Sequence, residues 1–502
     1  LKMGAVDKDA YFEKHSITDA AYYRLPDTRE GWVLSNAHLI DLHFASTNPK
    51  GQKNLVLDMS DIREKGAKIK GFGGTASGPM PLIEMLFDIN KILNARVRRH
   101  LSSVDMTDIG NMIGKTVVAG NVRRSAELAL GSADDEDFIT MKQDQEKLMH
   151  HRWASNNSVA VDSKFSNYGP IADSIQHNGE PGIVNLELSK NYGRKIDGLQ
   201  KDIDPNVEGT NPCGEISLSN GEPCNLFEVF PYVASQQNWD LDEAFALGTR
   251  FSKRVTFSPY DWEVSRKAIK KNRRIGISMS GIQDWILSEL GNRVVVGYED
   301  AKDPETGEAI KKPIYDKRAV KMVDGLYKAV VKADKDYSDE LGCNTSLKHT
   351  TVKPSGTVAK LAGVSEGMHF HYAPYLIQRI RFQDSDPLLP ALKACGYHVE
   401  KDVYSKNTMV AEFPIRAAHA DSKAFASAGN VSIAEQFATQ AFLQTYWSDN
   451  AVSCTVTFQP DEGDQIAPLM KQYRFTTKST SLLPYVGNEF KQAPKEPIQP
   501  KV

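Results

Sequence analysis

Hydrophobic residues recur at helical spacing in several stretches of this 502-residue chain. After Pro81 they predict one packed helix, because residues three and four apart share a helical face. The apolar positions of this helix are Leu82, Ile83, Met85, Leu86, Ile89, Leu93 and Val97. Further helices are predicted, partly from their capping residues, over 134–150, 242–253, 316–340 and 432–447.

Short apolar, β-branched runs lie between these helices. They predict strands at 158–161, 183–186, 274–281 and 451–458. Strands that alternate with helices indicate an α/β fold with a largely parallel sheet, open or closed. Residues 298–315 are polar and turn-rich and are expected to form an exposed insertion, and from Pro484 the chain becomes a tail without a core pattern.

Composition narrows the class of protein. Lys and Arg total 61 against 64 Asp and Glu, so the net charge of −3 argues against a protein that coats nucleic acid. No apolar run approaches the ~18 residues of a membrane span. Five cysteines in so long a chain are too few for a disulfide framework and are typical of a reducing compartment. We therefore expect a cytoplasmic protein with no nucleic-acid or membrane partner.

The most informative stretch contains Asn211, Cys213 and Glu215, with Cys224 eleven positions after Cys213. Along an extended loop, residues two apart share a face, so the carboxamide, thiol and carboxylate can point at one substrate. An inert, buried cysteine is the usual alternative for an isolated motif of this kind. The flanking Pro212 and Gly214, which favour a turn, and the second cysteine argue for a reactive thiol instead.

Two other stretches are candidates for phosphate binding. Residues 351–358 are predicted to form a strand, a tight turn and a helix start, whose free amides and hydroxyls favour an anion. Residues 119–126 place Arg123 and Arg124 on a Gly/Asn turn that could meet a phosphate or a base, although a solvated turn explains the same pattern. His369 and His371 could share one strand face as metal ligands, but no third ligand accompanies them and a hydrogen-bonded structural role is favoured. No metal site is therefore expected.

Taken together, these landmarks resemble the class II, adenosylcobalamin-dependent ribonucleotide reductases. The matching segments, in chain order, are 74–79, 120–126, 155–161, 180–182, 211–215, 224–226, 274–276 and 354–357. The long segment 91–115, with 26–32 and 446–450, is more similar to the monomeric triphosphate reductases than to the dimeric diphosphate enzymes.

The resemblance implies a ten-stranded α/β barrel with a central finger loop, residues 209–225. It divides the chain into the remainder of an N-terminal, effector-region segment (1–70), a catalytic barrel (71–480) and a C-terminal tail (481–502). The family's partner for Cys224 has no counterpart in the first 212 residues, which contain no cysteine, and the last cysteine is Cys454. We therefore expect an internal portion of a longer reductase, with early strands of the barrel missing.

The resemblance also implies a reaction. Adenosylcobalamin would generate a thiyl radical on Cys213, Glu215 would act as general base, Asn211 would hold the sugar hydroxyls, and Cys224 would supply one of two reducing thiols. The residues expected to bind the substrate are Ser155, Pro354, Ser355, Gly356 and Thr357. The residues expected to form the specificity loop, between effector and substrate, are Gly120, Asn121, Arg123 and Arg124.

The implied partners are a ribonucleoside triphosphate, a deoxynucleotide effector and a thioredoxin-like reductant, and the enzyme is expected to be a monomer. Two alternatives stay open at this stage. One is a ribonucleoside-diphosphate reductase of a related class with a metal-generated radical, and the other is an inactive fragment that only binds nucleotides.

Overall fold

The computed structural model describes residues 19–44, 46–48, 51–69, 75–119, 125–403, 408–485 and 491–499. The chain forms two compact units, one of residues 1–129 with 140–156 and the other of 130–139 with 157–502. No helix within the described ranges has the length and apolar character needed to cross a bilayer. The division of the chain at residues 70 and 480 stays a prediction, since these units reflect contacts and not roles.

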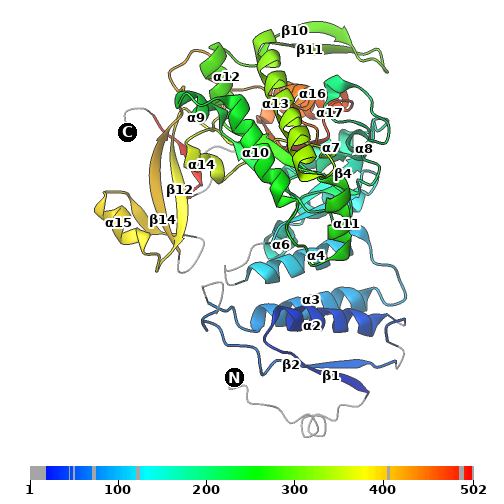
Figure 1. The fold of residues 1–502 in the computed structure, drawn as a ribbon. Helices are drawn as coiled ribbons and strands as arrows, with labels where there is room; N and C mark the ends of the chain where they lie inside the picture. Colours follow the sequence, from blue (N-terminus) through cyan, green and yellow to red (C-terminus); the bar gives the residue numbers. More distant parts are fainter. Residues whose placement is uncertain are drawn as a thin grey trace. The chain divides into compact units, whose positions relative to one another are not determined.

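The first unit packs helices beside a small sheet (Figure 1). Its main elements are β1 (Ala20–Arg24), α2 (Arg29–His43), β2 (Asn54–Asp58), α3 (Met80–Ala95), α4 (Ser103–Val118) and α6 (Gln145–His150). Strands β1 and β2 are parallel. Helix α3 confirms most of the helix predicted after Pro81, because its apolar stripe, including Leu82 and Ile89, is buried in the core of this unit. The inclusion of Val97 was wrong, since the helix ends at Ala95 and Val97 is exposed.

Two groups of strands organise the second unit. The first is a sheet in the order β15-β16-β5-β4-β3, whose last two strands contain the boundaries between the units. Its members are β3 (Glu127–Ser132), β4 (Ser155–Val161), β5 (Gly182–Asn185), β15 (Thr455–Phe458) and β16 (Ser479–Pro484). Strand β15 is parallel to β16, and β16 is antiparallel to β5.

The second group is a set of parallel strands that follow the finger loop in the chain. Strand β8 (Leu226–Val229) is parallel to β9 (Gly276–Met279), and single parallel bridges continue this order from Ile277 to Thr350 and from Val352 to Val452. Within the described residues these strands do not close into a barrel. Parallel strands with helical connections confirm the predicted α/β class.

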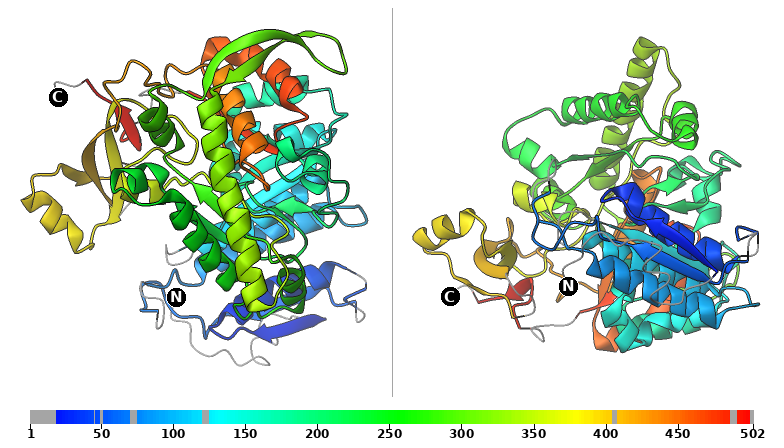
Figure 2. Two further views of the ribbon diagram at one scale, coloured as in Figure 1. Left: turned by 45° about the horizontal axis from the view of Figure 1, so that its top comes forward. Right: turned by 90° about the horizontal axis from the view of Figure 1, so that it is seen from below.

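The helices of the second unit lie around its strands (Figures 1 and 2). They are α5 (Glu136–Thr140), α7 (Gly169–Asn178), α8 (Leu186–Asn191), α9 (Pro231–Gln236), α10 (Leu241–Val255), α11 (Glu263–Asn272), α12 (Ile282–Leu290), α13 (Lys317–Leu341), α14 (Val358–Ala362), α15 (Leu388–Ala394), α16 (Ile433–Tyr446) and α17 (Ile466–Tyr473). Helices α10, α13 and α16 confirm three predicted helices, and Ser432 caps α16 as predicted. The structure adds Asp240 and Asp316 as the caps of α10 and α13, since each accepts a backbone N–H.

Two expectations about secondary structure were wrong, and a third was incomplete. The helix predicted over 134–150 is broken after Thr140, because Asp144 caps a new helix, α6, and accepts the Lys147 N–H. The insertion predicted at 298–315 has many exposed residues, as expected, but it is a regular β-hairpin of β10 (Val295–Lys302) and β11 (Ala309–Tyr315). The expected featureless tail contains β17 (Lys495–Pro497), which pairs with β12.

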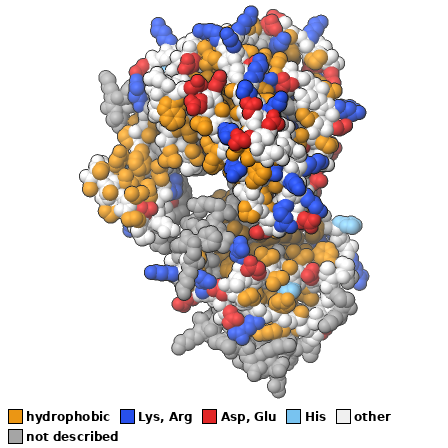
Figure 3. Space-filling model, in the orientation of Figure 1, with side chains coloured by type: hydrophobic (Ala, Val, Ile, Leu, Met, Phe, Trp, Pro, Cys, Tyr) orange, Lys and Arg blue, Asp and Glu red, His pale blue; other side chains and the backbone are white. Residues whose placement is uncertain are grey.

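The strand β17 completes an antiparallel sheet in the order β13-β14-β12-β17. The other strands are β12 (Tyr375–Gln383), β13 (Val399–Lys401) and β14 (Thr408–Arg416). Apolar side chains gather on the surface of this sheet and α15, Leu388 and Ile415 among them (Figure 3).

Candidate active site

The finger loop is a hairpin. The two-residue strands β6 (Gly209–Thr210) and β7 (Ser217–Leu218) pair at its base, and the Gly214 N–H donates to the Asn211 carbonyl at 2.9 Å. Gly214 has φ +80°, a conformation that glycine adopts without strain. The expected extended path was therefore wrong, because Pro212 and Gly214 impose a tight turn that places Cys213 at its apex.

Three consecutive carbonyl groups of the loop accept hydrogen bonds from different parts of the chain. The pairs are Ser453 Oγ to Cys213 O at 2.7 Å, Ser479 Oγ to Gly214 O at 2.9 Å and Ala451 N to Glu215 O at 2.8 Å. The Thr351 hydroxyl lies 2.9 Å from both Glu215 O and Ala451 O, so it shares its proton between the loop and the segment that anchors it. Because these contacts use only backbone oxygens of the loop, they fix the loop without engaging its side chains.

Replacing Thr351 by valine should therefore loosen Glu215 without touching its carboxylate. We expect a loss of about 1 kcal/mol of unfolding free energy, the usual worth of one hydrogen bond. We also expect a roughly tenfold or greater fall in turnover, because catalytic groups tolerate little displacement. Thr439→Val is the matched control, since the Thr439 hydroxyl bonds only within α16. Full activity of Thr351→Val in steady-state assays would contradict this role for the anchor.

Glu215 is a deeply buried charged side chain at the turn of the loop. It is 1% exposed, its carboxylate is hydrogen-bonded by the Asn211 side chain, and its Oε2 has no hydrogen-bond partner among the described residues. Burial raises the pKa of this carboxyl group, which the Asn211 contact and Lys353 only partly offset. An unpartnered, buried carboxylate oxygen beside a thiol is suited to accept a proton from a bound substrate.

Both cysteines of the motif are free thiols with exposed surface. Desolvation raises the pKa of Cys213, and the charge of Glu215 raises it further. The pKa of Cys224 rises to about 12, through desolvation first and then through Glu215 and Cys213. Since the charge of Glu215 acts on both thiols and Cys213 acts on Cys224, the structure brings the three groups together, with both sulfurs protonated at neutral pH.

Lys353 is a residue of this site that the motifs did not predict. Its charge lowers the pKa values of Cys213, Glu215 and Cys224, so its ammonium group lies near all three. Lys353 Nζ is 2.8 Å from the Glu228 carboxylate on β8. The only available signal was its place directly before the predicted phosphate turn.

The predicted phosphate turn follows at once. Ser355 is buried with φ +54°, and its hydroxyl accepts the Ala359 N–H at 3.1 Å, whereas Gly356 and Thr357 are exposed. Among the described residues, the backbone amides of Gly356 and Thr357 have no hydrogen-bond acceptor. These two amides can donate hydrogen bonds to a bound anion, and Pro354 is the residue that leads into the turn.

The remaining predicted residues are Ser155, the specificity loop and the two histidines. Ser155 is buried at the start of β4, and its carbonyl accepts a hydrogen bond from Lys142. Residues 120–124 of the predicted specificity loop lie outside the described residues. His369 accepts the Thr455 N–H at Nε2 and contacts the Glu366 carbonyl through Nδ1, and His371 bonds Asp284, so both imidazoles have structural partners.

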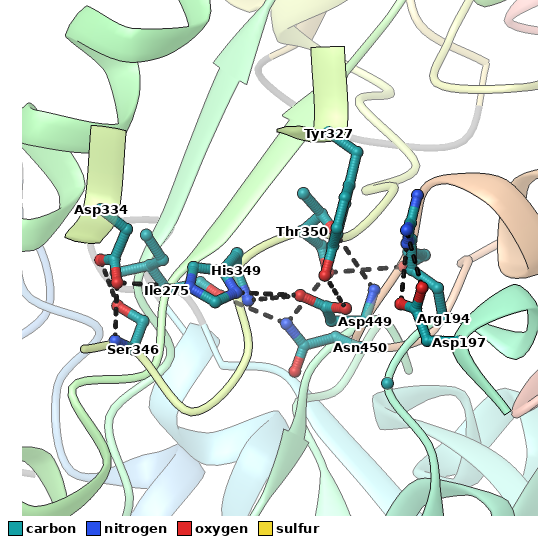
Figure 4. A network of polar contacts seen from close by, with 12 residues as sticks. Arg194, Asp197, Ile275, Tyr327, Asp334, Ser346, His349, Thr350, Asp449 and Asn450 are labelled. Carbon is teal, nitrogen blue, oxygen red and sulfur yellow. Dashed lines mark hydrogen bonds and ion pairs between the residues drawn. The ribbon is translucent and has the colours of Figure 1, made fainter. Parts of the chain in front are cut away.

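A buried polar network supports the segment that anchors the loop (Figure 4). His349 lies between two carboxylates, with Nε2 3.2 Å from Asp334 and Nδ1 3.1 Å from Asp449. Tyr327 donates to Asp449 at 2.9 Å, and the Arg194 guanidinium stacks 3.5 Å from the Tyr327 ring centroid. Because His349 precedes Thr351 by two residues, this network fixes the strand that holds Glu215.

The network predicts a pH dependence of stability. Burial alone would lower the pKa of His349, but its bonds to Asp334 and Asp449 raise it to about 9. A raised folded-state pKa gives stability that is complete below the unfolded value of about 6.5 and is lost as pH rises through 9. The span corresponds to about 3 kcal/mol. Denaturant titrations from pH 6 to 10 should therefore show a decline in the unfolding free energy of the wild type that His349→Gln largely lacks. Parallel declines in the two proteins would contradict this role of His349.

Sequence comparisons identify related proteins. A model of the B12-dependent ribonucleotide reductase insertion domain matches residues 1–93. The chain is 75% identical over 502 residues to the adenosylcobalamin-dependent ribonucleoside-triphosphate reductase of Lactobacillus acidophilus, covering all of this chain and 68% of that protein. It is 74% identical over 498 residues to the enzyme of the same name from Lactobacillus leichmannii, covering 99% of this chain and 67% of the relative.

Structural comparisons give the same result. A crystal structure of a B12-dependent, class II ribonucleotide reductase superposes with a TM-score of 0.92 at 72% identity, covering all of this chain and 69% of that one. The α subunit of the class Id ribonucleotide reductase of Actinobacillus ureae superposes with a TM-score of 0.51 at 12% identity, over 94% of this chain and 84% of that subunit. At that identity, the second match supports the fold alone.

Proposed function

The chain belongs to the class II, adenosylcobalamin-dependent ribonucleoside-triphosphate reductases, and we propose that the Cys213 finger loop is its catalytic centre. The enzyme reduces ribonucleoside triphosphates to 2′-deoxyribonucleoside triphosphates, and its cofactor is adenosylcobalamin. The observation that carries the assignment of the site is the unpartnered Glu215 Oε2 within electrostatic reach of two protonated thiols. The alternatives of a diphosphate enzyme of another class and of an inactive fragment are less well supported.

In this proposal, Cys213 is the residue that reacts with the ribose. Its thiyl radical takes the hydrogen atom from the 3′ carbon, which re-forms the S–H bond and leaves the unpaired electron on the sugar. Glu215 accepts the 3′ hydroxyl proton at Oε2, the oxygen that has no other partner. Asn211 bonds the same carboxylate and thereby orients it toward the sugar.

Reduction at the 2′ carbon completes the reaction. The 2′ hydroxyl leaves as water, and two thiols supply two electrons and two protons as they form a disulfide. Cys224 is one of these thiols, and its high pKa keeps the proton that it must deliver. Cys213 finally returns its hydrogen atom to the 3′ carbon, so the net change is one ribonucleotide and two thiols to one deoxyribonucleotide, water and one disulfide.

The Cys213 thiol is the group of this chain that is suited to react with the cofactor. The Cys213 thiol lies at the apex of the turn, has exposed surface and keeps its proton, so it fits a group that removes a hydrogen atom from it. When bound, adenosylcobalamin supplies the one-electron chemistry that converts this thiol to a radical. The anchored carbonyl groups of the loop keep the sulfur in one position meanwhile.

The remaining partners complete the proposal. Pro354, Ser355, Gly356 and Thr357 hold substrate phosphates, with Ser155 also in contact with the substrate. A deoxynucleotide effector acts through the loop that contains Arg123 and Arg124, a thioredoxin-like protein restores the thiols, and the enzyme works as a monomer.

Product analysis tests the activity. The chain, adenosylcobalamin, a ribonucleoside triphosphate, a deoxynucleotide and dithiothreitol are incubated without oxygen, and deoxyribonucleotide is measured by chromatography. We expect product only when both the cofactor and the thiol are present. Product without added cofactor would contradict the proposed dependence.

A further inference from the structure

A half-buried carboxylate, that of Glu366, lies between two ammonium groups beside the predicted phosphate turn. Glu366 Oε1 is 2.5 Å from Lys360 Nζ, and Glu366 Oε2 is 2.7 Å from Lys495 Nζ. The three side chains are 33%, 23% and 27% exposed in the order Lys360, Glu366 and Lys495. Lys360 comes from α14 and Lys495 from β17, so two segments far apart in sequence meet at this point (Figure 1).

The Lys360 ammonium also touches the turn itself. Its Nζ donates to the Gly356 carbonyl at 2.6 Å, which holds the charge within one hydrogen bond of the turn. Two ammonium groups and one carboxylate leave a net charge of +1 here. Although burial alone would raise the pKa of Glu366, the two lysines lower it, so the carboxylate stays ionised.

We propose that Lys360 and Lys495 form the subsite for the terminal phosphate of a ribonucleoside triphosphate. In the free enzyme, Glu366 holds both ammonium groups in place. A terminal phosphate offers more negative charge and more acceptor oxygens than a carboxylate, so it can take over both lysines while the turn holds the phosphates nearer the ribose. A diphosphate lacks this group and leaves the lysines with Glu366. The inference deepens the proposed function and rests on it.

A purely structural role is the competing explanation, in which the ion pairs only fasten β17 to α14. The two roles differ in what they predict for nucleotides of different length. A fastening role changes the binding of triphosphate and diphosphate equally, whereas a phosphate subsite changes the binding of triphosphate alone.

Calorimetric titration of the full chain with one ribonucleoside triphosphate and the matching diphosphate separates these cases. For Lys360→Met and Lys495→Met we expect triphosphate affinity to fall about tenfold to a hundredfold, as for a lost charge-assisted hydrogen bond, and diphosphate affinity to change less than about twofold. Lys495→Arg should restore most of the affinity. Glu366→Gln removes the competing anion and should tighten the binding of triphosphate.

Lys471→Met is the matched control, since Lys471 is also 27% exposed and pairs with Glu308 at 2.8 Å elsewhere in the same unit. Its affinities should equal those of the wild type. Equal losses for both nucleotides, or no loss in either lysine variant, would overturn the subsite and leave the proposed function standing. A wild-type chain that binds neither nucleotide would overturn both.

Discussion

Replacing Cys213 by serine is expected to abolish deoxyribonucleotide formation, with a fall of roughly four orders of magnitude or more, as for loss of an essential reacting group. A serine hydroxyl fits the same space but does not form the sulfur-centred radical that the reaction needs. The thiol lies at an anchored turn whose hydrogen bonds use the backbone, so the loop should keep its shape.

The control for this substitution is Cys395→Ser, because Cys395 is also a free, exposed cysteine but lies at the end of α15. Its turnover should match that of the wild type. Nucleotide affinity, measured by calorimetry, should be unchanged in both variants, which separates loss of chemistry from loss of folding. Substantial product from Cys213→Ser would mean that another group carries the radical.

Glu215→Gln should lower turnover by about a hundredfold to ten-thousandfold, the usual contribution of a general base. Glutamine keeps the volume of the side chain and a hydrogen bond to Asn211, so the change removes mainly the capacity of the free Oε2 to take a proton.

The pH dependence of turnover tests the role of Glu215 as general base most specifically. A base acts when it is ionised, and burial raises the pKa of Glu215, so wild-type turnover should rise with pH through a pKa above the ordinary glutamate range. Glu215→Gln should lose this rising limb and keep KM nearly unchanged. A profile with the same limb in both proteins would assign the proton transfer to a different residue.

The parts of the site that could be predicted from sequence are those formed by residues close together in the chain. Asn211, Cys213 and Glu215 lie within five consecutive residues, and the Pro and Gly that shape the turn stand between them in the motif. The start of α16 was similarly accessible, because its cap Ser432 acts on an N–H within the first turn of the helix. Both features depend on residues that are neighbours in the chain.

Features that depend on distant partners were not accessible. Lys353 owes its role to the carboxylate of Glu228, 125 positions earlier, and to the finger loop. The pairing of β17 with β12 places Lys495 beside Glu366, 129 positions away, and nothing in the polar composition of the tail predicts it. The hairpin at 295–315 was missed for a different reason, since its polar, exposed strands lack the apolar alternation that identifies a half-buried strand.

The central claim is that this chain makes its radical on Cys213. The most direct test mixes the chain, adenosylcobalamin, a ribonucleoside triphosphate and a deoxynucleotide without oxygen, and records the visible absorbance of the cofactor and the paramagnetic resonance spectrum. We predict a rapid absorbance change and a paramagnetic signal in the wild type and neither in Cys213→Ser, although both proteins bind nucleotide. The same signals in Cys213→Ser, or none in a nucleotide-binding wild type, would contradict the account.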